Sequence, residues 1–197
     1  MQKLSYKIIN GITIYRIVIT PILIYFILTR NINVFKWLLA LSFFTDLIDG
    51  YLARTFKVTS ILGSKLDSIG DDLTILSGIF GLYIFRFDFL KQEILGIGIL
   101  LSLFLFQNIL ALIKYKKITS FHTYLAKISA VFQGVFLILA FFLDEPNYLL
   151  YNVTLILTGL DLIEEIILVI IIPKWEINVK GLYWVLKKLK AQKNNSD

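Results

Sequence analysis

The sequence predicts an all-α integral membrane protein with six transmembrane helices and short amphipathic helices at the N- and C-termini. Of its 197 residues, 57% are hydrophobic and only 17% are charged, which is too apolar for an ordinary soluble domain. Six stretches approach or exceed the roughly 20 apolar residues that a helix needs to cross a bilayer. The chain has no cysteine, so disulfides and thiolate metal sites are excluded.

The six expected spans follow one another with short connections. They are Ile12 to Leu28, Val34 to Leu52, Ile61 to Phe85, Ile94 to Ile113, Tyr124 to Phe142 and Leu149 to Ile172. The first span contains Arg16, lacks a small-residue cleavage site and precedes five others, so we interpret it as a retained helix and not as a signal peptide. Because no internal repeat or long linker interrupts the chain, residues 1–197 are expected to form a single membrane domain around a bundle over 12–172.

Both ends of the chain are basic and amphipathic. Residues 1–10 form a short interfacial segment, and residues 174–197 form a basic tail in which "VKGLYWVLKKLKAQK" mixes aromatic and aliphatic residues with lysines. Such segments are expected to lie on anionic lipid; a solvated basic tail is the alternative, and it suits "AQKNNSD" better than it suits Tyr183 and Trp184. The net charge of +6 is therefore interpreted as attraction to the cytoplasmic leaflet, and nucleic acid is not an expected partner.

The distribution of basic residues predicts the orientation. With the N-terminus inside, thirteen Lys and Arg residues fall in cytoplasmic segments and four fall outside. Both termini, and the polar segment over 46–72, are then expected on the cytoplasmic face of a bacterial inner membrane.

Acidic residues within the apolar stretches are the strongest functional signal. An ionised side chain inside a span costs about 2.5 to 3.5 kcal/mol on insertion scales, so such residues are expected to have a function. Two groups occur. They are Asp46, Asp49, Asp67, Asp71 and Asp72 in the second and third spans, and Asp161, Glu164 and Glu165 in the sixth.

Helical spacing brings the first group together. Asp46 and Asp49 share one helix face, and Asp67 and Asp71 share another across the intervening turn. Four converging carboxylates repel one another unless cations lie among them, and hard divalent ions with oxygen ligands, Mg²⁺ or Mn²⁺, suit that need.

Small residues and one arginine flank these acids. Gly50, Ala53 and Gly63 remove side-chain bulk and allow a ligand to approach the backbone, while Arg54 offers a planar donor fork suited to phosphate. The combination is typical of a site that binds a metal-bound diphosphate.

These positions follow the order D-x-x-D-G-x-x-A-R, eight residues, G-x-x-x-D-x-x-x-D, which resembles the signature of the CDP-alcohol phosphotransferases. Residues 10–21, "NGITIYRIVITP", look like the segment that opens many members. The resemblance implies a two-metal enzyme of phospholipid biosynthesis that transfers a phosphatidyl group from CDP-diacylglycerol to a small alcohol and releases CMP. It also implies a homodimer.

The same resemblance implies roles for single residues. Asp46, Asp49, Asp67 and Asp71 would hold two divalent ions, and Asp71 would also be the catalytic base on the acceptor hydroxyl. Gly50, Ala53, Arg54 and Gly63 would bind the CDP-lipid.

The acceptor is less clearly indicated. Lys127 in the fifth expected span favours a phosphorylated acceptor, because a buried ammonium is costly without a partner, and residues 123–133 are similar to part of the phosphatidylglycerophosphate synthases. Glycerol 3-phosphate is the first expectation; inositol phosphate, serine and phosphatidylglycerol are alternatives. Asp72 and Ser68 depart from residues common in the family and bear on the acceptor.

Other interpretations stay open. Asp161, Glu164 and Glu165 either pair with Arg16 or Lys65 as structural charges or help to bind a polar acceptor. A divalent cation transporter, or a structural membrane protein, would also bury acids, but neither explains the glycine, alanine and arginine spacing.

Overall fold

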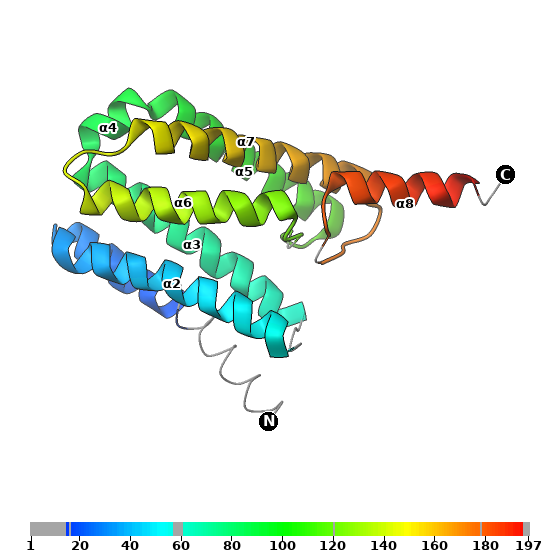
Figure 1. Cartoon of the computed structure of the whole chain (residues 1–197), viewed down its shortest axis with the longest axis horizontal. Helices are drawn as coiled ribbons and strands as arrows, with labels where there is room; N and C mark the ends of the chain where they lie inside the picture. The colour runs from blue at the N-terminus through cyan, green and yellow to red at the C-terminus, as the bar shows by residue number, and fades with distance from the viewer. Residues whose placement is uncertain (1–14, 16, 57–60, 120, 178, 195–197) are drawn as a thin grey trace. The chain divides into compact units, whose positions relative to one another are not determined.

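The computed structural model describes residues 15, 17–56, 61–119, 121–177 and 179–194. Within the helices, the side chains of 46, 47, 49–56, 61–65, 67 and 192–194 lie outside the described part. All regular structure in these residues is helical: Ile17–Leu28, α2 Ile32–Phe56, α3 Ile61–Phe85, α4 Phe87–Gln92, α5 Ile94–Tyr115, α6 Tyr124–Phe142, α7 Tyr148–Ile171 and α8 Leu182–Asn194 (Figure 1). The all-α prediction is confirmed for this part of the chain.

Three of the described helices are long and apolar enough to cross a membrane. They cover Ser68–Phe85 in α3, Ile94–Tyr115 and Tyr124–Phe142, and they confirm the third, fourth and fifth expected spans by length and composition. Ile17–Leu28 and Ile32–Thr45 are shorter apolar helices. The 24-residue α7 is long enough, but every 18-residue stretch of it includes three acids. The six-span topology therefore stays a prediction.

Many large apolar side chains are exposed on these helices. Leu95, Ile113 and Leu149 each expose about three quarters of their surface, at 79%, 74% and 76%. A soluble domain rarely leaves so much apolar surface in water, whereas hydrocarbon surrounds such side chains without cost. These surfaces are those of an integral membrane protein.

The chain divides into two compact units: Met1–Glu93 with Gln133–Tyr148, and Ile94–Phe132 with Leu149–Asp197. In the first unit, Phe35 of α2 is fully buried, and its ring lies 5.0 Å from that of Phe141 and 5.5 Å from that of Phe85, between centroids. A Cβ on Gly81 would lie 2.6 Å from the Phe35 ring, so only glycine lets α3 approach this closely. Small residues at such contacts are typical of packed membrane helices.

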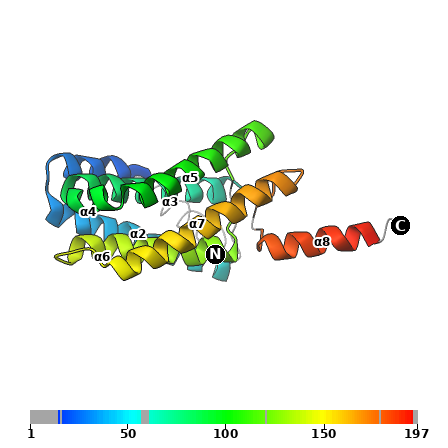
Figure 2. The same ribbon diagram turned by 90° about the horizontal axis from the view of Figure 1, so that it is seen from above.

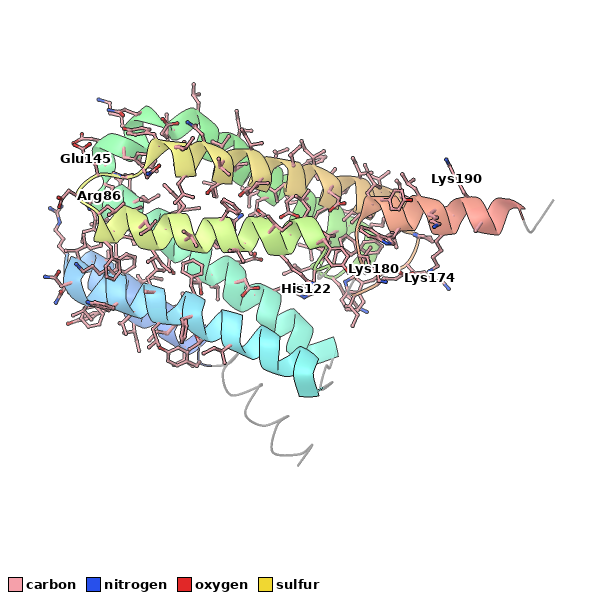
Figure 3. All side chains as sticks on the ribbon, in the orientation of Figure 1. Arg86, His122, Glu145, Lys174, Lys180 and Lys190 are labelled. Atoms are coloured by element: carbon pink, nitrogen blue, oxygen red, sulfur yellow. The ribbon has the colours of Figure 1, made fainter. Side chains whose placement is uncertain are left out.

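Arg86 stabilises the end of α6 and the loop that follows it in the first unit. The residue follows α3 directly, and its guanidinium donates to the Ala140 carbonyl at 3.0 Å, to the Asp144 carbonyl at 2.8 Å and to the Leu143 carbonyl. These carbonyls belong to the last turn of α6 and the loop after it, where no intrahelical donor is available. Figure 3 shows Arg86 and Glu145 at this turn.

Replacing Arg86 tests this cap. We expect Arg86→Ala to lower the free energy of unfolding by about 2 kcal/mol, since a charged donor is lost and the part-buried Ala140 carbonyl loses its partner. Detergent-denaturation titration of the purified chain measures the change. Lys91→Ala, an exposed position on α4, is the matched control and should change it by less than about 0.5 kcal/mol. Unchanged stability of Arg86→Ala would contradict the cap.

In the second unit, side chains at the end of α5 donate hydrogen bonds to the C-terminal end of α7. Lys114 Nζ donates to the carbonyls of Val169 and Ile170, both at 2.9 Å. The Tyr115 hydroxyl donates to the Ile172 carbonyl at 2.7 Å. These donors satisfy the free carbonyls of the C-terminal turn of α7, and a basic group there also suits the helix dipole. α8 starts beside the end of α7 and extends past it in both views (Figure 2).

Candidate functional site

The predicted signature lies on two consecutive helices of the first unit. Its first half, 46–54, belongs to α2, and its second half, 63–71, belongs to α3. The helices contact one another, and residues 57–60 join them, so the end of α2 and the start of α3 lie within roughly 17 Å of chain reach. Figure 1 shows the two helices side by side. The helical spacing assumed for these acids is confirmed.

Most of the predicted site side chains lie outside the described part of the chain. They are Asp46, Asp49, Gly50, Ala53, Arg54, Gly63 and Asp67. Asp71 is described, and its side chain is half-buried on α3. Among the described residues no group of three or more His, Asp or Glu could hold a metal ion, and three of the four predicted ligands are absent from that set. Convergence of the four carboxylates therefore stays a prediction.

The described part of α3 around Asp71 is polar, but its hydroxyl groups form hydrogen bonds within the helix. The Thr74 hydroxyl donates to the Gly70 carbonyl at 2.8 Å, and the Ser77 hydroxyl donates to the Leu73 carbonyl at 2.8 Å. Both hydroxyls are used within their own helix, which makes them poor candidates for metal or substrate. Asp71 and Asp72, both half-buried, are the acidic side chains described on this helix.

Lys127 lies at the start of α6 beside an aromatic ring. The residue lies on α6 in the second unit, is exposed on the protein, and its ammonium lies 5.4 Å from the centroid of the Tyr124 ring. Exposure on the protein surface does not test burial within a membrane, so the expected burial of this ammonium stays a prediction. Tyr124 is one helical turn away, so the cation–π contact is local. Binding of an acceptor by Lys127 stays a prediction.

The acids of α7 have protein partners that sequence spacing does not reveal. Glu164 accepts a hydrogen bond from the Leu182 backbone N–H at 2.9 Å. Glu165 accepts one from the Thr119 hydroxyl at 3.4 Å, and Thr119 accepts one from Gln107 at 2.5 Å. The side chains of the expected partners Arg16 and Lys65 lie outside the described residues. Two of the three acids thus connect α7 to the start of α8 and to the loop after α5, which favours a structural role for them.

Asp161 differs from its two neighbours. Its Oδ1 atom is buried and has no hydrogen-bond partner among the described residues, and the same holds for the second carboxylate oxygen of Glu164. A buried polar atom normally finds a partner. Sequence reasoning identified these acids by their cost in an apolar helix, but it could not assign their contacts, which come from residues up to 46 positions away.

Comparison with known proteins agrees with the signature. The sequence profile of the family described as CDP-alcohol phosphatidyltransferase matches residues 7–171, which include both halves of the signature. The cardiolipin synthase (CMP-forming) of Rattus norvegicus is 40% identical over 67 residues, and that of Homo sapiens is 37% identical over 67 residues. Each match covers 34% of this chain and 22% of the relative, so the chain matches about a fifth of their length. No solved structure matches significantly. Because the profile spans most of the chain, this membrane protein belongs to the CDP-alcohol phosphatidyltransferase family of enzymes.

Proposed function

We propose that this protein transfers the phosphatidyl group of CDP-diacylglycerol to the hydroxyl of a glycerol-containing acceptor and releases CMP. The observation behind the proposal is the spacing of Asp46, Asp49, Asp67 and Asp71 on two consecutive helices that contact each other. The family match over residues 7–171 includes all four positions and supports the same chemistry.

The donor set suits divalent metal ions. Four carboxylates without any cysteine or nearby histidine are oxygen ligands, which Mg²⁺ and Mn²⁺ prefer. We propose that Asp46, Asp49, Asp67 and Asp71 hold two such ions. When bound, a pair of divalent ions would offset the negative charge of the diphosphate and of the leaving CMP.

The remaining roles belong to the chain itself. Arg54, one residue after the small Ala53, would donate to a phosphate oxygen of the CDP-lipid. Gly50 and Gly63, which have no side chains, would leave room for the nucleotide against the backbone. Asp71 would accept the proton of the attacking hydroxyl, a role that requires it within hydrogen-bond reach of the acceptor.

Two acceptors share the expected chemistry. Glycerol 3-phosphate and phosphatidylglycerol both present a free glycerol hydroxyl close to a phosphate, as a monoester and a diester respectively. Lys127 motivates the first. The two cardiolipin synthases that match part of the chain favour the second. Inositol phosphate and serine lack a comparable observation.

The membrane arrangement is also part of the proposal. The excess of basic residues in alternate connections supports six spans with both termini and the signature on the cytoplasmic side, in a bacterial inner membrane. We further propose a single functional domain and a homodimer, the latter by family analogy alone.

An acceptor screen tests the reaction. The full chain in lipid nanodiscs is supplied with CDP-diacylglycerol, Mg²⁺ and each acceptor in turn, and CMP and the lipid product are quantified by mass spectrometry. We expect CMP and the lipid product to form in parallel when one of the two acceptors, glycerol 3-phosphate or phosphatidylglycerol, is supplied. Lys127→Ala should raise the KM for that acceptor several-fold with kcat less affected, because a charged contact to phosphate is lost.

The opposing outcomes are distinct. Absence of CMP with every acceptor would refute the transferase, and flux of divalent ions into sealed vesicles that persists in Asp71→Asn would support a transporter instead. An unchanged KM in Lys127→Ala would remove Lys127 from the acceptor site and leave the reaction class intact. Lys117→Ala, an exposed lysine whose ammonium lies 5.1 Å from the Trp175 ring centroid, is a matched control with the same kind of aromatic contact.

A further inference from the structure

The first turn of the C-terminal helix α8 contacts the rest of the second unit, whereas residues 186–191 of the helix are exposed. Its backbone begins at Leu182 and continues to Asn194, and the sequence over this range contains four lysines and no acid. The sequence predicts an interfacial segment over 174–197; the helix covers only 182–194 of it, and the contacts at its start are described. Figure 3 shows Lys174 and Lys180 in the loop before α8 and Lys190 on the helix itself.

Three contacts hold the start of α8. The Glu164 carboxylate accepts the Leu182 N–H at 2.9 Å, which caps the helix N-terminus with a negative charge. The Tyr124 N–H donates to the Lys180 carbonyl at 3.2 Å, and the Tyr124 and Trp184 rings lie 5.3 Å apart between centroids. These contacts tie the first turn of α8 to α6 and α7.

Gly181 makes this cap possible. Its φ of +145° is one that residues with a side chain rarely adopt, and a Cβ there would lie 3.1 Å from Glu164 Oε1. Glycine therefore allows the chain to turn into α8 while the carboxylate approaches the helix N-terminus. The direction of α8 relative to α7 is set by this turn.

One apolar stripe runs along α8 from Leu182 to Leu189. Leu182 and Val185, in the first turn, pack against a buried cluster that includes Leu168, Val169 and Val179. Leu186 and Leu189 continue the same stripe but remain 42% and 38% exposed. The stripe thus passes from the protein core to a part of the helix where its leucines are exposed.

Lysines flank the exposed part of the stripe. Lys187 and Lys190 are exposed, and Lys188 lies 4.0 Å from Glu176 in a pair whose members are both at least half exposed. Such an exposed pair contributes little, so the positive charge of this half is not neutralised by the protein. An apolar stripe bordered by ammonium groups matches a layer of anionic headgroups over hydrocarbon.

We propose that the outer half of α8, from Leu186 onward, lies on an anionic bilayer surface, with Glu164 and Gly181 holding it in that direction. The inference rests on the membrane nature of the chain and not on the proposed reaction. The charge of the bilayer, and not its apolar interior alone, decides whether the helix is bound. Each lysine near an anionic surface strengthens binding about fivefold.

Spin labelling tests this placement without any use of catalysis. Because the chain has no cysteine, Leu189→Cys and Ala191→Cys each accept a single nitroxide; the two positions lie about 200° apart on the helix. In nanodiscs with anionic phosphatidylglycerol, we expect the label at 189 to be accessible to oxygen and protected from a water-soluble nickel chelate, and the label at 191 to show the reverse. In neutral phosphatidylcholine the protection at 189 should decrease.

Charge variants sharpen the test. Lys187→Gln with Lys190→Gln should shift the bound-to-free ratio about 30-fold toward the free state in anionic nanodiscs. Lys36→Gln with Lys91→Gln changes the net charge equally and should leave the label at 189 protected. Equal chelate access at 189 in both lipids would overturn the proposal, as would protection that depends on protein concentration, which would indicate a second copy on this stripe.

A distance measurement tests whether Glu164 holds the start of α8. With labels at Ile156→Cys on α7 and Leu189→Cys on α8, the distance distribution measured by pulsed EPR should broaden in Glu164→Ala and stay narrow in Glu164→Gln, whose amide oxygen still accepts the Leu182 N–H. An unchanged distribution in Glu164→Ala would remove Glu164 from the anchor.

Discussion

Asp71→Asn is expected to lower the rate of CMP release by at least about 10³-fold while the protein remains folded. The substitution keeps the shape of the side chain but removes a base, whose loss alone costs about 10² to 10⁴ in rate. It also removes one negative charge from the proposed ligand set, which weakens metal binding. Single-turnover release of CMP from CDP-diacylglycerol in nanodiscs measures the effect.

The folded state is checked separately from activity. Asp71 is half-buried on α3, so the isosteric amide should leave the helical circular dichroism and the unfolding transition close to those of the parent chain. Asp88→Asn, the same chemical change at an exposed position on α4, serves as the matched control and should retain full activity. A rate in Asp71→Asn above a tenth of the parent value would contradict both proposed roles of Asp71.

Removal of divalent ions by EDTA is expected to abolish CMP release, and added Mg²⁺ or Mn²⁺ should restore it. Metal ions contribute several kcal/mol to stabilising charge in phosphoryl chemistry, which corresponds to a loss of at least about 10³-fold. If two ions bind in the same concentration range, the rate should rise with the metal concentration more steeply than a single-site curve. Titration of CMP release against free Mg²⁺ checks both expectations.

A second titration separates binding from chemistry. Calorimetry of Mn²⁺ binding to the purified chain should give about two ions per chain, and fewer in Asp46→Asn or Asp67→Asn. Labelling at position 189 should be unaffected by EDTA, because α8 is held by Glu164 and lipid and not by the metal ions. Full CMP release in EDTA would refute the metal site while leaving the placement of α8 untouched.

Local composition by itself determined the long apolar helices in the described part of this protein. The ranges Ile61–Phe85 and Tyr124–Phe142 were predicted to the residue, because a transmembrane helix satisfies its backbone hydrogen bonds internally and depends only on its own apolar length. The spacing of the signature acids could be recognised for a related reason, since carboxylates at i, i+3 and i, i+4 need only one helix to share a face. The short α4 over Phe87–Gln92 was not predicted, because six residues are too few for a helical period to be seen.

Contacts between distant parts of the chain were decided only by the tertiary structure. Arg86 binds carbonyls 54 to 58 residues away, and Glu164 caps a helix that begins 18 residues later. In each case the partner of the side chain is a backbone group at a helix end, and the packing of the helices brings it near. The sequence alone shows that a charged residue in an apolar stretch needs a partner, because an unpaired charge is costly there. Which partner it has depends on how the helices pack.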